Sequence, residues 1–238
     1  MRQSNLYIII YAGALTIVCG GLLALASEGL KEKQQYNIDM ESKKNILSTV
    51  ITLKDGDDIN ALYSKRVKPF VVDFQGNVVE GMRPKDVDRA VEYKKAPSER
   101  LLPVFEFKNE NDSTKIDYVV LSVFGYGLWN NIWGFVALES DLNTIRGVKF
   151  QHAGETPGLG ARIESDQEVQ DRYRGKHIYS DGKLVSVAMM KGEGQDYSDN
   201  PHQVDGMSGA TLTAKGVNNM LKDYLAAYEN YIKKKKNK

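Results

Sequence analysis

The chain has 238 residues, of which 42% are hydrophobic and 26% charged, and this composition is typical of a folded globular protein rather than a disordered one. Its 32 lysine and arginine residues nearly balance its 31 aspartate and glutamate residues, so the net charge of +1 excludes nucleic-acid binding through a strongly basic surface. A single cysteine, Cys19, excludes a disulfide framework and a thiolate zinc cluster, and the sequence has no Walker A, G-x-G-x-x-G or G-x-S-x-G motif.

The first predicted element is a membrane-spanning helix. Residues 6–26 form an apolar run, which at about 1.5 Å per residue spans about 30 Å, the thickness of a bilayer core. A cleaved signal peptide ending at Ala26 and a lipoprotein modified at Cys19 are the alternatives. The apolar run is longer than the usual signal-peptide core of about 7–15 residues, and Val18 is too bulky for a lipoprotein signal. We therefore expect a retained anchor over residues 1–30, whose flanking charges do not predict its orientation.

The rest of the chain predicts a charged helical linker and one folded domain. The linker covers residues 31–66 and carries a narrow apolar stripe that includes Ile46 and Leu47. Runs of β-branched and aromatic residues predict strands at 70–74, 102–107, 118–124, 132–138, 145–150 and 184–190. Helical patterns occur at about 165–174 and, with an amphipathic face, at about 209–233. The fold class is therefore α+β, with a transmembrane helix before a domain, residues 67–238, of mixed or antiparallel sheet and flanking helices.

The segment D-G-M-S-G-A-T-L-T at residues 205–213 stands at the start of the last predicted helix. Small residues leave backbone N–H groups accessible there, and the helix dipole adds positive potential, so this segment predicts an anion site suited to phosphate. The alternative is an ordinary helix cap made by Ser208 or Thr211, with no ligand.

Two further loops combine glycine with polar or aromatic residues. The segment G-E-T-P-G-L-G at 154–160 allows a flat ligand to approach the backbone, while Glu155 and Thr156 supply polar groups. The segment G-Y-G-L-W at 125–129 places Trp129 next to exposed backbone, as an aromatic wall would require. A tight surface loop and a buried tryptophan in a turn are the respective alternatives.

Taken together, these motifs resemble a known family. Residues 205–213 match the flavinylation motif D-x-x-[ST]-G-A-T-x-[ST]. With the loops at 125–129 and 154–160 and the N-terminal anchor, essentially the whole chain is similar to the NqrC family of the sodium-translocating NADH:quinone reductases. The flavinylation motif and the glutamate–proline–glycine loop also occur in the G subunit of the related Rnf complex. The long insert after the anchor and G-L-W at 127–129 favour the NqrC family.

The resemblance implies a covalent FMN, joined through its phosphate to the hydroxyl of Thr211 by a separate flavin transferase that uses FAD and magnesium and releases AMP. Thr213 is the nearest other hydroxyl and matches only the trailing position of the motif. Asp205 would help the transferase or hold the loop, and Lys191 would neutralise the phosphate unless it is simply an exposed lysine. The cofactor-binding residues expected from the resemblance are Thr211, Ser208, Gly209, Ala210, Asp205, Leu128, Trp129, Glu155, Thr156, Gly158, Leu159 and Lys191.

The implied function is electron transfer within a membrane complex that oxidises NADH, reduces a quinone and exports Na⁺. The chain would pass electrons to the flavin of NqrB, would have NqrA, NqrB, NqrD, NqrE and NqrF as partners, and would not be catalytic alone. We expect no catalytic residue, no metal, no NADH site and no nucleic-acid partner. The family is anchored in the lipid of the bacterial inner membrane, with its FMN domain on the periplasmic side. The alternatives are an Rnf-type G subunit and a membrane-anchored binding module without redox function.

Overall fold

The computed structural model describes residues 4–237, which divide into two compact units, one up to Ser42 and the other from Lys43 onward. Helix α1 (Asn5–Ser48) runs through the first unit without interruption and ends in the second. Within the described residues it is the one helix long and apolar enough to cross a membrane, with a window of mean hydropathy 2.3 that has no buried residue. Because α1 does not end at residue 30, no helix boundary separates anchor from linker, and the limits 1–30, 31–66 and 67–238 stay predictions.

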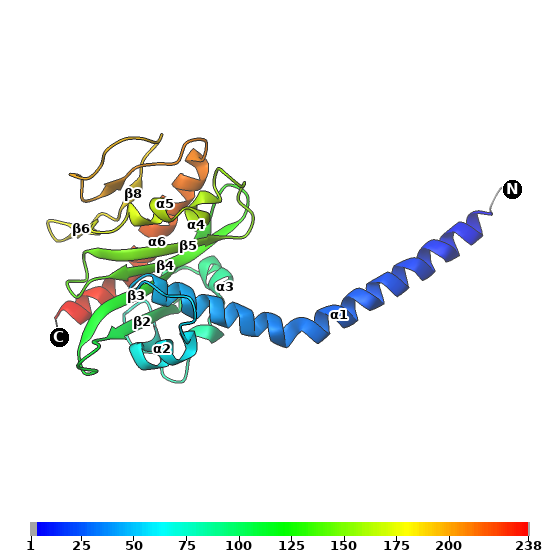
Figure 1. Ribbon diagram of the computed structural model, residues 1–238, viewed down its shortest axis with the longest axis horizontal. Coiled ribbons are helices and arrows are strands. Elements are labelled where there is room, and N and C mark those ends of the chain that lie inside the picture. Colours follow the sequence, from blue (N-terminus) through cyan, green and yellow to red (C-terminus); the bar gives the residue numbers. More distant parts are fainter. Residues whose placement is uncertain (1–3, 238) are drawn as a thin grey trace. The chain divides into compact units, whose positions relative to one another are not determined.

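The second unit is built on a five-stranded antiparallel sheet in which neighbours in sequence are neighbours in space (Figure 1). The strands are β1 (Val67–Val72), β2 (Leu102–Lys108), β3 (Ile116–Tyr126), β4 (Asn131–Leu138) and β5 (Ile145–His152). The first five predicted strands are therefore confirmed, with ends shifted by a few residues. The sheet and its flanking helices also confirm the α+β fold class.

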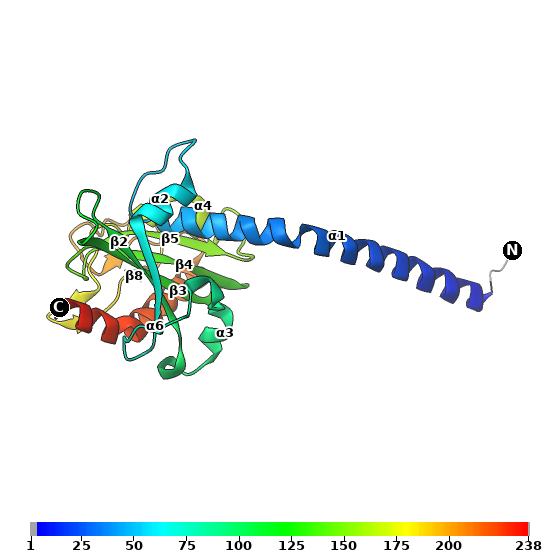
Figure 2. The same cartoon turned by 90° about the horizontal axis from the view of Figure 1, so that it is seen from below.

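Each face of the sheet carries its own apolar core. Helix α6 (Thr211–Lys236) packs across one face (Figure 2) and buries a stripe that includes Val217, Met220 and Leu221, as its sequence period predicts. The other face is covered by Ile46 and Leu47 from the last turn of α1, which confirms their predicted apolar stripe. The sheet thus has two buried faces.

Helix α6 approaches the sheet very closely at Gly216. A Cβ atom there would lie 3.0 Å from Gly127 Cα and would overlap the carbonyl oxygen of Tyr126. This contact places the first turns of α6 against the loop that joins β3 to β4. The four lysines at the other end of α6 each contact a side chain of the domain: Lys233 contacts Glu229, Lys234 contacts Asn77, Lys235 contacts Glu106 and Lys236 lies over the ring of Tyr179.

Three predicted elements differ from the structure: the helical linker, the strand at 184–190 and the helix near 165–174. The helical linker is interrupted at residues 49–58, after which Asp58 caps a separate helix, α2 (Ile59–Arg66). The single strand predicted at 184–190 is wrong, because Ser186 adopts a φ of 65° that no strand permits. Instead β6 (Tyr179–Ser180) and β7 (Lys183–Leu184) form a hairpin, and β8 (Ala188–Met189) pairs in parallel with β9 (Gln203–Val204).

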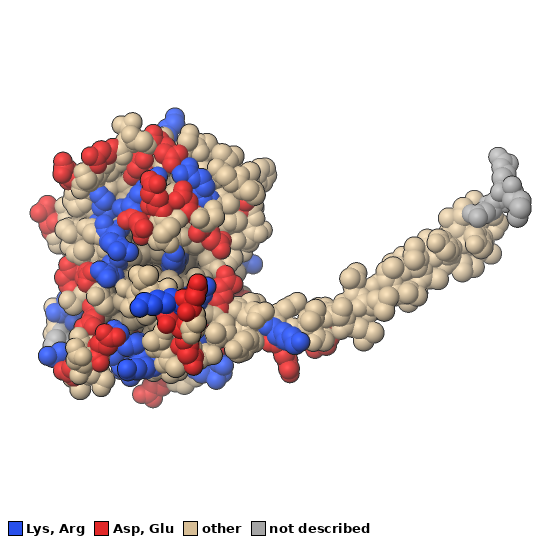
Figure 3. Space-filling model, viewed as in Figure 1, with Lys and Arg blue, Asp and Glu red and all other residues tan. Residues whose placement is uncertain are grey.

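Two 3-10 helices, η1 (Pro84–Asp86) and η2 (Pro97–Glu99), and three short α-helices complete the domain. The α-helices are α3 (Arg89–Lys94), α4 (Arg162–Ser165) and α5 (Gln167–Asp171), and the last two replace the single helix predicted near 165–174. Acidic and basic side chains are interspersed over the visible face of the domain in Figure 3, in keeping with the net charge of +1. No broad field of one sign is visible on that face.

Candidate functional site

The three loops singled out in the sequence meet at a hollow of about 200 Å³ beside the first turn of α6. The hollow is lined by Leu128, Glu155, Thr156, Leu159, Gly160, Gly209, Ala210, Thr211, Leu212 and Thr213. Residues separated by more than eighty positions in the sequence are therefore side by side. Of the residues predicted to bind a cofactor, Ser208, Asp205, Trp129, Gly158 and Lys191 do not line this hollow.

Among the described residues, no side chain caps the start of α6. Ala210 is the N-cap residue and makes no side-chain cap hydrogen bond, so a cap by Ser208 or Thr211 is excluded. Gly209 turns the chain into the helix with a φ of 73°, and a Cβ there would lie 2.7 Å from Leu159 Cδ2. The first turn of α6 therefore presents backbone N–H groups beside the hollow, where an anion is favoured.

The two threonine hydroxyls of the motif have opposite environments. Thr211 is exposed at the hollow, whereas Thr213 is only 1% exposed. The Thr213 hydroxyl donates a hydrogen bond of 2.5 Å to Glu155 Oε2. Of these two hydroxyls, only that of Thr211 is thus open to a reagent that comes from solvent.

Glu155 connects the walls of the hollow. Glu155 is 3% exposed. Its carboxylate accepts from the Thr213 hydroxyl through Oε2 and from the backbone N–H of Trp129 through Oε1 at 2.9 Å. A Cβ on Gly127 would lie 2.5 Å from Oε1, and a Cβ on Gly160 would lie 2.6 Å from Oε2. The absence of side chains at these two glycines is what lets the carboxylate bridge the β3–β4 loop, the 154–160 loop and α6.

Apolar side chains form an exposed rim around the hollow. Leu128, Leu159 and Leu212 are 46%, 41% and 57% exposed, and Trp129 is 69% exposed. The indole N–H of Trp129 donates to Thr156 Oγ1 at 3.2 Å, which fixes the ring toward the second loop. Such a rim of large apolar groups suits the face of a planar aromatic ligand. Leu212 also lines the hollow and was not predicted, although its place next to Thr211 in the sequence could have indicated it.

A network of charges stands behind residues 205–208, and the sequence analysis did not anticipate it. Asp205 accepts the backbone N–H groups of Gly194 and Gln195 at 2.7 and 3.2 Å, so it holds the loop. Glu193 pairs with Arg162 at 2.6 Å, and the Arg162 guanidinium is the main reason that its pKa falls to about 2. Lys191, which was predicted to lie near the phosphate, is exposed and does not line the hollow.

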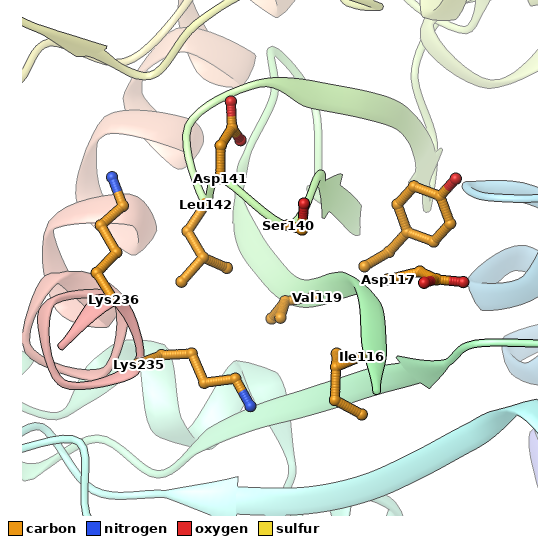
Figure 4. Close-up of a pocket in the computed structure, with 9 residues that line it drawn as sticks. Ile116, Asp117, Val119, Ser140, Asp141, Leu142, Lys235 and Lys236 are labelled. Carbon is orange, nitrogen blue, oxygen red and sulfur yellow. The ribbon is translucent and has the colours of Figure 1, made fainter. Parts of the chain in front are cut away.

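A larger hollow, of about 440 Å³, lies at the opposite end of α6 (Figure 4). Its charged groups are already engaged. Lys235 pairs with Glu106, and Asp141 accepts hydrogen bonds from the turn that contains Thr144. Since these groups are satisfied within the domain, this hollow offers less to a charged cofactor than the one beside Thr211.

Comparison with known proteins gives a consistent result. The model of the FMN-binding domain family matches residues 127–226. The chain is 32% identical to the C subunit of the Na⁺-translocating NADH-quinone reductase of Pseudomonas aeruginosa, over 94% of this chain and 92% of that protein. It is 30% identical to the C subunit of the same reductase of Yersinia pestis, over 89% and 85%.

Solved structures agree with this similarity. The crystal structure of the C subunit of the reductase from Parabacteroides distasonis superposes with a TM-score of 0.73 and 32% identity, covering 85% of this chain and 96% of that one. The structure of Shewanella oneidensis NqrC superposes with a TM-score of 0.72 and 27% identity, covering 87% and 100%.

Proposed function

Since the chain belongs to the NqrC family of the Na⁺-translocating NADH-quinone reductases, we propose that its Thr211 carries FMN as a covalent phosphoester. It is a membrane-anchored, flavin-binding electron-transfer subunit of this multi-subunit complex. The cofactor FMN supplies reversible uptake of electrons when bound.

The observation that carries the attachment is the contrast between the two threonines of the motif. Thr211 is exposed beside a hollow, and Thr213 is buried with its proton committed to Glu155. In the proposed step the Thr211 oxygen attacks the FMN phosphorus of FAD, the P–O bond to AMP breaks, and the hydroxyl proton passes to the transferase. FAD and threonine thus give the phosphoester and AMP.

The residues around the hollow fit the two ends of FMN. The N–H groups of the first turn of α6, with Ser208, Gly209 and Ala210 leading into it, would stabilise the phosphoester anion. Leu128, Trp129 and Leu159 would contact the isoalloxazine ring, and Gly158, whose φ is 73°, would keep the backbone close to it. Glu155 and Thr156 would hold these walls in place. Asp205 would keep the loop in shape, and Lys191 would contribute positive potential from a distance.

We further propose that the chain relays electrons from a neighbouring redox centre to the flavin of NqrB. Its anchor would lie in the bacterial inner membrane, with the FMN domain on the periplasmic side, residues 1–30 as the anchor, 31–66 as the linker and 67–238 as the domain. A covalent link would keep the cofactor on a domain that faces a compartment where free FMN is scarce.

The test is co-expression of the full chain with its flavin transferase, followed by flavin fluorescence on a denaturing gel and intact mass. Thr211→Val removes the acceptor hydroxyl with little change in shape, and Thr211→Ser keeps a hydroxyl there. Thr213→Val is the matched control at the neighbouring hydroxyl. We expect one FMN on the wild type, Thr211→Ser and Thr213→Val, and none on Thr211→Val. A dark wild-type band, with a transferase that labels a control substrate, would refute covalent attachment.

A further inference from the structure

The segment that leads into Thr211, residues 205–210, is held from outside by side chains that the sequence analysis did not assign. We call it the acceptor loop. Arg172 donates through Nη1 to the carbonyl oxygens of Gly206 and Asp205 at 2.5 and 3.4 Å. Its side chain is only 13% exposed, so these bonds are shielded from solvent. The first half of the acceptor loop is thereby tied to the segment that follows α5.

Glu193 holds the second half of the acceptor loop. Its Oε2 accepts the backbone N–H of Ser208 at 3.0 Å. The same carboxylate receives two bonds from Arg162, at 2.9 and 2.6 Å, and one from Arg172 at 3.3 Å. A paired guanidinium fork of this kind fixes the direction of a carboxylate as well as its position.

Arg162 makes this contact relevant to the site, because it lies two residues after the end of the 154–160 loop. The backbone N–H of Arg162 donates to Leu159 O at 3.2 Å, and Leu159 in turn contacts the hollow beside Gly209. Glu193 therefore joins the two segments that border Thr211, one through a guanidinium and the other through a backbone amide. Gly192 and Gly194, with φ of 90° and 88°, turn the chain on both sides of it.

We propose that Glu193, oriented by Arg162 and Arg172, is a positioning residue that sets the acceptor loop for modification of Thr211. It does not line the hollow, so it acts through Ser208 and the loop rather than on the flavin. This inference rests on the proposed attachment of FMN to Thr211. In the turn at residues 191–194, attachment of FMN then depends on the carboxylate of Glu193 and not on Lys191.

The experiment measures the rate of FMN attachment to the full chain in detergent by purified transferase and FAD, over a range of chain concentrations. Glu193→Gln keeps the shape but removes the charge that pairs with both arginines. Glu168→Gln is the matched control, because Glu168 also bonds Arg172, at 3.3 Å, but its side chain is 80% exposed and does not contact the acceptor loop. Thermal unfolding and the midpoint potential of the labelled fraction are measured on the same samples.

We expect Glu193→Gln to lower kcat/KM of attachment about tenfold, with Glu168→Gln at the wild-type rate and the FMN potential unchanged in both. A wild-type rate for Glu193→Gln overturns the inference. If Glu193→Gln fails to fold, Arg162→Lys is the second variant, since lysine keeps the positive charge but cannot make the two parallel hydrogen bonds of the guanidinium. A wild-type rate of attachment in Arg162→Lys would then overturn the inference. A wild type that takes up no FMN refutes the proposed function itself, whereas labelled wild type with equally fast variants refutes only the role of Glu193.

Discussion

Replacing Glu155 by alanine tests whether this one carboxylate holds the walls of the hollow together. The substitution leaves two donors without their acceptor, the Thr213 hydroxyl and the Trp129 N–H. An unpaired buried polar group costs about 1–3 kcal/mol. Thr213 is 1% exposed and bears the full penalty, whereas water can reach the N–H of the exposed Trp129 loop. We therefore expect a loss of about 2 kcal/mol.

The matched variant is Glu155→Gln, which keeps an oxygen for Trp129 and offers an N–H to the Thr213 oxygen. We expect it to cost less than about 1 kcal/mol, since both sites retain a partner. About 2–4 °C per kcal/mol is usual for a domain of this size. Glu155→Ala should then lower the melting temperature of the full chain in detergent by about 4–8 °C, measured by the fluorescence of the two tryptophans.

Hydrogen exchange at residues 127–129 gives a local readout of the same contact. It should accelerate in Glu155→Ala and stay near the wild-type rate in Glu155→Gln. Unchanged melting and exchange in Glu155→Ala would show that the carboxylate does not connect these segments. Equal losses in the two variants would show that its charge, and not its hydrogen bonds, matters.

Three further outcomes are expected from thermal unfolding. Gly216→Ala should destabilise the domain by about 1–3 kcal/mol although alanine is the better helix former, because its Cβ would overlap the backbone of the β3–β4 loop. Gly154→Ala, whose Cβ would meet nothing closer than 3.8 Å, should be neutral. Tyr228→Phe should cost about 1 kcal/mol of stability, because the buried hydroxyl donates to a carbonyl oxygen at 2.6 Å. Tyr173→Phe should leave the stability unchanged, because the hydroxyl of Tyr173 has no hydrogen-bond partner among the described residues. The pKa of Glu193 lies near 2 in the folded protein, below its usual 4.5. The ionised carboxylate should therefore stabilise the folded protein above pH 4.5, and this stabilisation should be lost as the pH falls from about 4.5 to 2. Glu193→Gln should lack this pH dependence.

The elements of the domain were predictable wherever a single pattern dominated. The strands of the sheet carry β-branched and aromatic runs, and the stripe at Val217 and Met220 repeats with the helical period. The region from 176 to 204 was not predictable in this way, because its backbone is held by particular side chains. Lys176 donates to the carbonyl oxygens of Tyr197 and Asn200. Besides the pairing of β8 with β9, the side-chain amide of Asn218 in α6 accepts from the backbone N–H of Met189 and donates to its carbonyl oxygen.

The site likewise has residues that the sequence predicts and residues that it does not. Its loops could be found because glycine and proline mark them locally, and the helix start could be found from the small residues before it. The sequence does not predict the contribution of Arg162, Arg172 and Glu193. Charged residues are common, and nothing in the local sequence distinguishes a glutamate that is paired from one that is solvated. Lys191 was predicted from the family resemblance, as a basic residue near the phosphate, but Glu193, two residues later, makes the contact with the acceptor loop.

The choice between the two threonines follows from helix geometry and needs no special chemistry. Their hydroxyls have the same intrinsic reactivity, but residues two apart on an α-helix point about 200° away from each other. Thr213 is in register with Val217 and Met220 at i+4 and i+7, so the stripe that attaches α6 to the sheet also buries Thr213. Thr211 must then face outward in any helix that starts at this point. The amphipathic period of α6 thus explains why only the hydroxyl of Thr211 is accessible to a reagent from solvent. A shift of the helix register would bury Thr211 and expose Thr213 instead.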